Sequence, residues 1–261
     1  MQSDAAKANP NTAFLDTGDG DGAGGPSWYP RLLISADDLG ARFLDPALRD
    51  EALALMDRIT PDPYTDYVSA FMREGARRFG PDWRYADIIT VLLGLSDVLK
   101  PRSYLEIGVR RGRSLCAVAS RAPSCHLFGF DMWQAGYAGI ENPGPGFVRG
   151  ELERVGHQGP VTFVNGDSHK TLPEFFARDP ERRFDLITVD GDHSAEGARQ
   201  DLLDVLPYLA VGGAVVFDDI DHPAHPELLD VWNRTVADNP CFSNWSFRGL
   251  GYGVSFALRR F

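Results

Sequence analysis

The sequence predicts an α/β fold in which a mostly parallel sheet is preceded by a group of helices. From residue 104 onward, short apolar segments alternate with segments that have helical spacing. This alternation is typical of parallel strands connected by helices. Residues 46–99, in contrast, place apolar side chains at helical spacing with no strand-like segment between them. The last two strand-like segments are joined by a short glycine-containing stretch, which favours an antiparallel hairpin.

Three regions follow from this pattern. Residues 1–27 are polar and rich in Gly, Asp and Ala, so we expect them to form a disordered tail. Residues 101–261 are predicted to form the ligand-binding α/β domain. Residues 28–100 are predicted to form an N-terminal helical cap, with helices over about 46–59, 65–79 and 85–99.

The elements of the α/β domain are predicted in chain order. Strands are expected over 104–107, 127–130, 161–164, 184–189 and 214–217, followed by a hairpin over 242–247 and 254–258. Helices are expected to begin at Ser114 and to cover about 198–209 and 227–236. Residues 133–147 are rich in Gly and Pro and are predicted to form a loop near the ligand, either a mobile lid or a plain surface loop.

The net charge of −11 argues against two classes of partner. Lys and Arg side chains drive binding to nucleic acid and to anionic membranes, because both surfaces carry phosphates. No segment approaches the roughly 20 apolar residues of a membrane span, and no signal-peptide pattern is present. The three cysteines form no CxxC pair. We therefore expect a cytoplasmic protein that acts on a small molecule. Whether it forms a homo-oligomer through the cap stays an open question at this point.

Each predicted strand of the parallel sheet ends at or beside an acidic residue. These residues are Glu106, Asp131, Asp167, Asp190 and the pair Asp218 and Asp219. Ligands of open parallel sheets bind outside the carboxyl ends of the strands. A single acid at such an end is often a helix cap or a turn former. Acids after five successive strands predict instead a shared ligand-binding cleft.

The spacing of these residues indicates which ligand the cleft holds. Asp131 lies 23 residues after Gly108, where an acid usually binds ribose hydroxyls. The dinucleotide fingerprint GxGxxG is missing, because Arg110 and Arg113 occupy two of its glycine positions. The pattern therefore favours a ligand that contains adenosine but no pyrophosphate, such as S-adenosylmethionine.

Residues 85–258 resemble the class I S-adenosylmethionine-dependent methyltransferases. The resemblance rests on the segments Tyr104–Gly108, Val189–Ser194 and Gly212–Asp219. It is closest to a bacterial small-molecule group that includes sugar and natural-product O-methyltransferases. It implies a Rossmann-like seven-stranded sheet with an antiparallel last strand, preceded here by the helical cap. Arg110 departs from the family pattern, which often has a glycine at this position.

The resemblance also implies which residues contact the cofactor. Glu106 and Gly108 are expected at its methionine end, Asp131 at its ribose, and Asp167 with Ser168 at its adenine. The full set of expected contacts adds neighbouring residues in the same loops, namely Gly112, Ser114, Met132, Trp133 and Asp190.

Asp190, Asp218 and Asp219 are the predicted metal ligands. They follow two strands that are neighbours in this fold, and Mg²⁺ prefers carboxylate oxygens. The arrangement resembles the metal sites of the catechol-type and macrolide-sugar O-methyltransferases. Such an ion lowers the pKa of a substrate hydroxyl and orients its oxygen. The alternative is that these acids cap helices and bind a cationic or polyol substrate without a metal.

His193 is the predicted general base, acting with Asp190 as the catalytic pair. An unperturbed imidazole has a pKa of about 6.5, which suits proton transfer near neutral pH. The alternative is a histidine of the protein surface or a helix cap.

The sequence therefore predicts an enzyme, an O-methyltransferase that acts on a hydroxyl of a sugar or natural product with the help of Mg²⁺. No motif fixes the acceptor atom, so N-methylation and metal-independent transfer remain alternatives. A nicotinamide-dependent oxidoreductase and a non-catalytic binding module are the alternatives from other classes.

Overall fold

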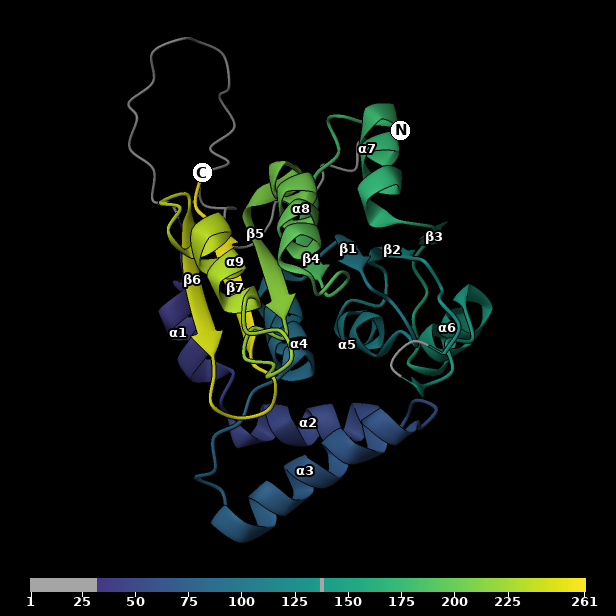
Figure 1. The fold of residues 1–261 in the computed structure, drawn as a ribbon. Coiled ribbons are helices and arrows are strands. Elements are labelled where there is room, and N and C mark those ends of the chain that lie inside the picture. Colours follow the sequence, from purple (N-terminus) through teal and green to yellow (C-terminus); the bar gives the residue numbers. More distant parts are fainter. Residues whose placement is uncertain (1–31, 137–138) are drawn as a thin grey trace, which may run out of the picture.

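The computed structural model describes residues 32–136 and 139–261. The tail predicted over 1–27, the first residues of the cap and Tyr137 in the predicted loop therefore lie outside the described residues. Figure 1 shows a central sheet with helices packed on both of its faces, and two further helices, α2 and α3, that lie outside the layer formed by α4 and α5.

Within the described residues, seven strands form one sheet. Their bounds are β1 Ser103–Ile107, β2 His126–Asp131, β3 Val161–Asn165, β4 Phe184–Val189, β5 Leu209–Asp218, β6 Phe242–Phe247 and β7 Val254–Arg259. The order across the sheet is β3-β2-β1-β4-β5-β7-β6, with β7 antiparallel to both of its neighbours and the other pairs parallel. The predicted α/β class and the antiparallel last strand are confirmed.

The strand order reverses between β1 and β4. From β1 the chain runs outward through β2 to β3, and then returns to place β4 and β5 on the other side of β1. The carboxyl ends of these five strands lie along one edge, because the strands are parallel. The reversal leaves a crevice at that edge between the two sets of connecting loops, and such crevices are where α/β proteins bind ligands.

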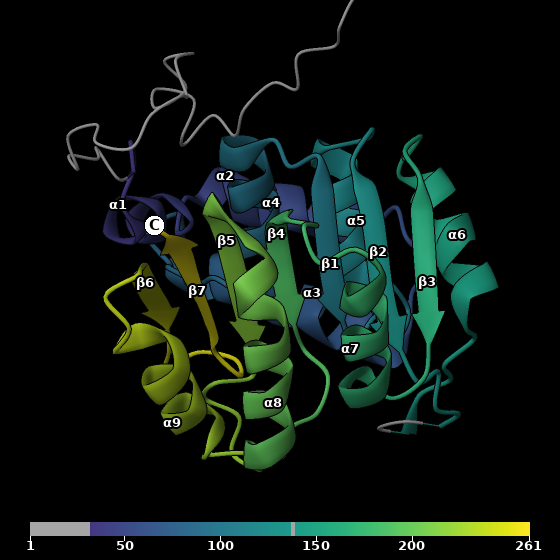
Figure 2. The ribbon, with the colours of Figure 1, turned by 90° about the horizontal axis from the view of Figure 1, so that it is seen from above.

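Helices cover the two faces of the sheet and bury its apolar side chains (Figure 2). One face carries α7 Ser168–Arg178, α8 Ala195–Val205 and α9 Leu228–Trp232, which extends as a π turn over Asn233–Ala237. The other face carries α4 Ile88–Leu99, α5 Arg113–Arg121 and α6 Pro145–Arg154. Strand residues alternate between the two cores: Tyr104 packs with the α4 layer and Leu105 with the α8 layer.

The helices that precede the sheet share a core with it. Helix α1, Ala36–Arg42, packs against β6, where the amide of Ala36 donates a hydrogen bond of 3.1 Å to Ser243 Oγ. Helix α2, Pro46–Met56, packs against α4, α5 and the outer helix α3, Pro63–Phe79. The predicted cap is thus continuous with one helical layer of the α/β domain, and its outermost helix is α3.

Some elements differ from their predicted bounds. The prediction has no counterpart for α1, and it assigns the start of α6 to a loop. Strand β5 begins at Leu209, five residues before the predicted strand. A register shift between β4 and β5 and the positive φ of Gly212, 78°, accommodate the glycine pair inside the strand. A Cβ at Gly213 would lie 2.7 Å from the carbonyl oxygen of Asp185. The glycines therefore serve strand packing.

Among the described residues, no helix combines the length and apolar character that crossing a bilayer requires.

Candidate active site

Asp131 joins two loops at the carboxyl edge of the sheet. Its Oδ2 accepts a hydrogen bond of 2.6 Å from the amide of Arg110, in the loop after β1. Its Oδ1 accepts one of 2.5 Å from the amide of Trp133, in the loop after β2. Arg110 and Trp133 both have positive φ, 51° and 52°, which L residues other than glycine seldom adopt. The carboxylate thus holds two unusual turns in place and remains half-buried at the cleft.

Gly108 brings the loop after β1 against the loop after β4. Its φ is 89°, and a Cβ at this position would overlap the carbonyl oxygen of Asp190. The amide of Asp190 donates to the carbonyl of Ile107 at 3.0 Å, which continues the β1–β4 pairing into the loop. A side chain at position 108 would separate the two strands where the predicted ligand crevice opens.

Glu106 is fully buried beneath this edge. It accepts hydrogen bonds from the Tyr104 hydroxyl at 2.5 Å and from the Ser114 hydroxyl at 2.7 Å, and the Tyr104 oxygen lies 2.8 Å from Thr188 Oγ1. Burial raises the pKa of Glu106 to about 8, against the lowering effect of its two hydrogen-bond donors. In this structure Glu106 and Ser114, two predicted cofactor contacts, connect β1 to α5.

The first turn of α5 faces the same edge. Gly112 is its N-cap residue, with φ 76° and no side chain to cap the helix. A Cβ there would lie 2.5 Å from Val148 Cγ1, so glycine allows α6 to pack closely. The free amides of a helix N-terminus carry partial positive charge, which suits a carboxylate of a ligand.

Trp133 and Met132 form the outer wall beyond β2. The Trp133 indole donates a hydrogen bond of 2.7 Å to Asn165 and packs edge-on against Phe163, 5.6 Å between ring centroids. Met132 is 64% exposed, so its side chain is free to cover a ligand at this edge. Both predicted contacts thus flank the Asp131 carboxylate.

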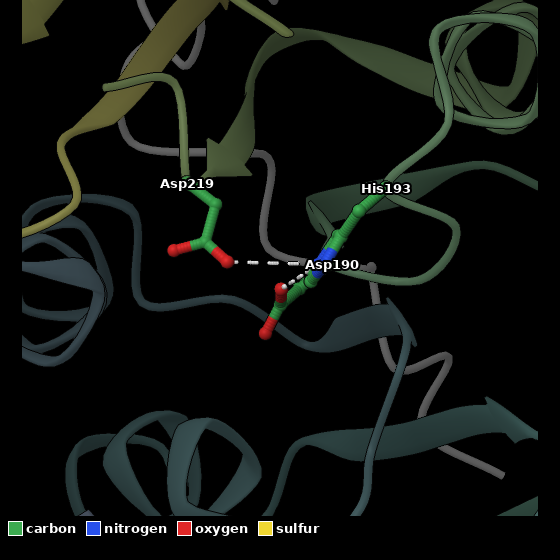
Figure 3. A group of neighbouring side chains, drawn as sticks. All are labelled: Asp190, His193 and Asp219. Atoms are coloured by element: carbon green, nitrogen blue, oxygen red, sulfur yellow. Dashed lines mark hydrogen bonds and ion pairs between the residues drawn. The ribbon is translucent and has the colours of Figure 1, made fainter. Parts of the chain in front are cut away.

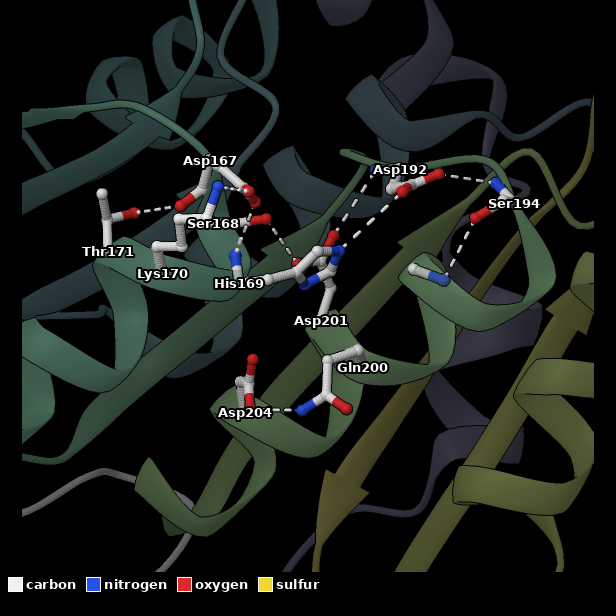
Figure 4. Close-up of polar contacts among 11 residues, drawn as sticks. Asp167, Ser168, His169, Lys170, Thr171, Asp192, Ser194, Gln200, Asp201 and Asp204 are labelled. Carbon is white, nitrogen blue, oxygen red and sulfur yellow. Dashed lines mark hydrogen bonds and ion pairs between the residues drawn. The ribbon is translucent and has the colours of Figure 1, made fainter.

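Asp167, Ser168 and their neighbours form a polar network beyond β3 (Figure 4). Asp167 caps α7 by accepting from the amide of His169 at 3.1 Å, and it pairs with Lys170 at 3.1 Å. The Lys170 hydrogen bond holds the pKa of Asp167 below its usual range. The Ser168 hydroxyl donates at 2.7 Å to Asp201, a fully buried residue of α8.

Asp201 also connects this network to the loop after β4. The amide of Asp192 donates to its Oδ2 at 3.4 Å, and Nδ1 of His169 lies 3.4 Å from its Oδ1. Burial raises the pKa of Asp201 to about 6. The sequence analysis did not single out Asp201, because an acid inside a helix has no motif that marks it as buried.

Asp190, His193 and Asp219 come together at the tips of β4 and β5 (Figure 3). Nε2 of His193 lies 3.3 Å from Asp190 Oδ1 and 3.7 Å from Asp219 Oδ2. One ligand atom from each residue falls within 4.8 Å of the other two, which is the spacing of a metal site. Within the described residues, this group contains two of the three predicted metal ligands and the predicted base.

Asp218 lies outside this group, although it is the neighbour of Asp219. It is the last residue of β5, and Asp219 leaves the strand with a positive φ of 59°. Burial and the charges of Asp219 and Asp190 raise the pKa of Asp218 well above its usual value. Burial and the charge of Asp190 raise that of Asp219 to about 7. The close carboxylates thus repel one another, and a cation placed among them relieves that repulsion.

The same carboxylates stabilise the protonated form of His193. The hydrogen bond to Asp190 raises the pKa of its imidazole, and the nearby Asp219 charge acts in the same direction. An imidazole with a raised pKa is a stronger base, and the carboxylates stabilise the proton that it accepts.

A cavity of about 190 Å³ adjoins this group, and both Asp218 and Asp219 line it. Its remaining walls come from α3, the start of α4, Arg113 of α5 and the turn between β6 and β7. The sequence analysis did not find these residues. Tyr64, Tyr67 and Phe71 have helical spacing in the sequence, but only the packing of α3 shows that their side chains meet the sheet edge.

Residues 105–220 match a family model described as a methyltransferase domain. No curated protein matches the sequence. The fold is similar to TomG from Streptomyces achromogenes, an O-methyltransferase of tomaymycin synthesis solved with SAM: 20% identity, TM-score 0.55, covering 78% of this chain and 92% of TomG.

Two further solved structures share the fold. An O-methyltransferase from Bacillus cereus in complex with SAH has 16% identity and a TM-score of 0.51, covering 79% of this chain and 95% of that one. The SAH-bound methyltransferase PaMTH1 from Podospora anserina has 16% identity and a TM-score of 0.52, covering 92% and 100%. Residues 105–220 thus match a methyltransferase domain, and the whole sheet has the fold of these solved methyltransferases.

Proposed function

We propose that this enzyme methylates a hydroxyl oxygen of a small metabolite with the assistance of a divalent metal ion, Mg²⁺. The observation that carries the proposal is the position of the Asp190–His193–Asp219 group. It adjoins the loop edge around Gly108 through Asp190, and it adjoins the cavity through Asp219. A methyl donor on one side and an acceptor on the other would therefore meet beside these three residues.

The residues at the β1, β2 and β3 tips fit an adenosyl cofactor in this proposal. A carboxylate has about four lone-pair sites, and the two backbone amides at Asp131 occupy two of them. The remaining sites suit two ribose hydroxyls. Asp167 with Ser168 would face the adenine, and the open N-terminus of α5 after Gly112 would receive the methionine carboxylate.

The oxygen atoms of the Asp190–His193–Asp219 group fit a hard divalent cation. Asp190 and Asp219 supply carboxylate oxygens, the ligands that Mg²⁺ prefers, and substrate or water oxygens would complete the octahedron. Asp218, in the adjoining cavity wall, would ionise more readily once the ion is bound. A bound ion would lower the pKa of the acceptor hydroxyl and stabilise its oxygen as a nucleophile.

His193 is the proton acceptor in this scheme. Transfer forms a bond between the acceptor oxygen and the methyl carbon, breaks the bond between that carbon and sulfur, and releases the hydroxyl proton. His193 accepts the proton at its imidazole, and Asp190 orients the ring through the 3.3 Å contact.

The three carboxylates at this site favour one alternative, the N-methylation of an amine. Without a metal ion, Asp190, Asp218 and Asp219 would attract a cationic amine, which would lose a proton to His193 before its nitrogen attacks the methyl group. A hydroxyl acceptor needs the metal to offset these charges, whereas an amine does not.

The test is methyl transfer from radiolabelled S-adenosylmethionine to a panel of hydroxylated and amine acceptors, with and without EDTA. We expect turnover of a hydroxyl acceptor to fall more than tenfold in EDTA and to return on addition of Mg²⁺. Asp219→Asn should cause a similar loss while leaving S-adenosylhomocysteine affinity unchanged. The control Asp204→Asn changes a half-buried carboxylate of α8 that bonds Gln200, and it should retain full activity. Undiminished turnover in EDTA contradicts the role of the metal.

A further inference from the structure

The cavity beside Asp219 has a buried aromatic floor. Tyr85, at its base, is 7% exposed and stacks on Trp83, with 5.3 Å between ring centroids and 4° between planes. Phe71 of α3 meets the same Tyr85 ring edge-on at 5.1 Å. These contacts fix the orientation of the floor, because each ring is held by the next. A ligand that enters the cavity therefore meets preformed aromatic surfaces.

Tyrosines also surround the upper part of the cavity. Tyr64 lies half-buried in its wall, and the Arg113 guanidinium packs over the Tyr64 ring at 4.5 Å. Tyr67 and Tyr252 are at its rim, 59% and 38% exposed. The rim tyrosines belong to α3 and to the turn between β6 and β7. Aromatic rings of the protein thus extend from the rim of the cavity to its floor. The flat ring of a ligand packs well between such aromatic walls.

Charges in the cavity wall disfavour an anionic ligand. Asp87, Asp218 and Asp219 line it, and among the cationic side chains of the described residues only Arg113 does. The charge of Arg113 already acts on Asp87 and Asp218. A carboxylate or phosphate would lose its hydration in this partly buried space, and the one cationic side chain that lines it already faces two acids.

We propose that this cavity binds the methyl acceptor, that the acceptor is an uncharged aromatic hydroxyl compound with one or two rings, and that Tyr64 determines this specificity. The inference rests on the proposed function and narrows its substrate class, since it disfavours sugars, which lack a flat apolar ring, and anionic acceptors. The acceptor hydroxyl would point toward Asp219, where the cavity meets His193 and Asp190.

Three probes of similar size separate these classes. Catechol is flat and neutral, 3,4-dihydroxybenzoate is flat and anionic, and cis-1,2-cyclohexanediol is neutral but not flat. Binding is measured by calorimetry on the full chain with S-adenosylhomocysteine and Mg²⁺ present, so that no turnover is needed. We expect catechol to bind at least tenfold more tightly than either other probe. Equal affinity for the benzoate or for the diol overturns the proposal.

Variants of α3 then locate the binding site. Tyr64→Leu should weaken catechol binding about tenfold and leave S-adenosylhomocysteine affinity unchanged, while Tyr64→Phe, which retains the ring, should bind catechol like the parent. The matched control is Phe79→Leu, an exposed aromatic of α3 that does not line the cavity. Parent-like catechol affinity in Tyr64→Leu overturns the proposal.

The measurements distinguish a failure of the proposed O-methylation from a failure of the cavity assignment. If catechol binds in a Tyr64-dependent manner but no acceptor oxygen is ever methylated, the cavity assignment stands and O-methylation does not. If hydroxyl acceptors are methylated at equal rates in the parent and in Tyr64→Leu, O-methylation stands and the cavity assignment is overturned.

Discussion

Gly108 is the residue at which the backbone itself sets the geometry of the cleft. Its φ of 89° is unfavourable for an L side chain, and the place of a Cβ is taken by the Asp190 carbonyl. We predict that Gly108→Ala lowers the free energy of unfolding by about 2 kcal/mol or more, from strain and displaced backbone together. Urea denaturation followed by circular dichroism measures this change.

The control for this substitution is Gly150→Ala in α6. No atom lies within 4 Å of a Cβ at Gly150, and its φ is not in the left-handed region. Alanine has the higher helix propensity, so this variant should be more stable than the parent by up to about 1 kcal/mol. A Gly108→Ala variant with the urea midpoint of the parent would refute the close approach of the two loops.

At the same scale, the two aspartates after β5 show what sequence cannot resolve. Both were predicted as metal ligands, because residue type and position at a strand end are equal for the two. The structure groups Asp219 with Asp190 and His193, and it leaves Asp218 in the cavity wall. The difference arises from the positive φ at Asp219. The presence of an aspartate in the sequence does not predict this backbone conformation.

Among the secondary-structure elements, α8 contributes a residue that holds two loops of the cofactor edge. Asp201 accepts from Ser168 Oγ and from the amide of Asp192, and it faces His169 (Figure 4). We predict that Asp201→Asn weakens binding of S-adenosylhomocysteine five- to tenfold, because the amide presents a donor where these groups need an acceptor. Turnover at saturating S-adenosylmethionine should change less than twofold, since the Asp201 carboxylate bonds Ser168 and the amide of Asp192 rather than the side chains of Asp190 and His193.

Asp204→Asn, one turn further along α8, is the matched control. Asp204 accepts a hydrogen bond of 2.7 Å from Gln200 on the exposed side of the helix and does not touch the loops. Calorimetric titration with S-adenosylhomocysteine should give the parent affinity for this variant. The same affinity in Asp201→Asn would show that the loops hold their positions without Asp201.

Elements with strong local patterns were predictable, whereas elements that depend on packing were not. The strand over Phe242–Phe247 matches its predicted bounds, because aromatic residues that favour strands are followed by a glycine-containing turn signal. Helix α6 begins at Pro145, inside a stretch whose glycines and prolines indicate a loop. Proline is favourable in the first turn of a helix, but the helix is recognisable only once Val148 and Leu152 are seen to pack against the core.

For the whole molecule, the sheet order explains why the sequence predicted that the acids lie along one edge of the sheet. Parallel strands bring their carboxyl ends to one edge, so acids after successive strands must be neighbours in space. The cavity was not predictable, because α3 lies far from the strands in the sequence. The position of α3 depends on many weak contacts, since α3 packs on α2 and α2 packs on α4. The prediction thus identified the residues at the sheet edge and missed those that the preceding helices add.

The pH dependence of global stability should report on Glu106, at the centre of the sheet. Its pKa is raised to about 8 in the folded protein, compared with about 4.3 in an unfolded chain. Between these values the unfolded chain has lost the proton and the folded protein retains it. Unfolding therefore releases a proton, and rising pH favours unfolding by about 1.4 kcal/mol per pH unit from this group. The contribution is largest below pH 4 and is lost as the pH approaches 8.

Glu106→Gln removes this titration while keeping the size of the side chain, with Oε1 to accept from one of the Tyr104 and Ser114 hydroxyls and Nε2 to donate to the other. Other buried acids also titrate, so the informative quantity is the difference between the parent and the variant. We predict that, from pH 5 to 8, the free energy of unfolding from urea curves falls more steeply with pH in the parent than in Glu106→Gln. Glu153→Gln, at an exposed position of α6, should follow the parent slope. Parallel curves for the parent and Glu106→Gln would mean that the folded protein ionises Glu106 as readily as the unfolded chain does. The hydrogen bonds from Tyr104 and Ser114 would then outweigh the cost of burying the charge.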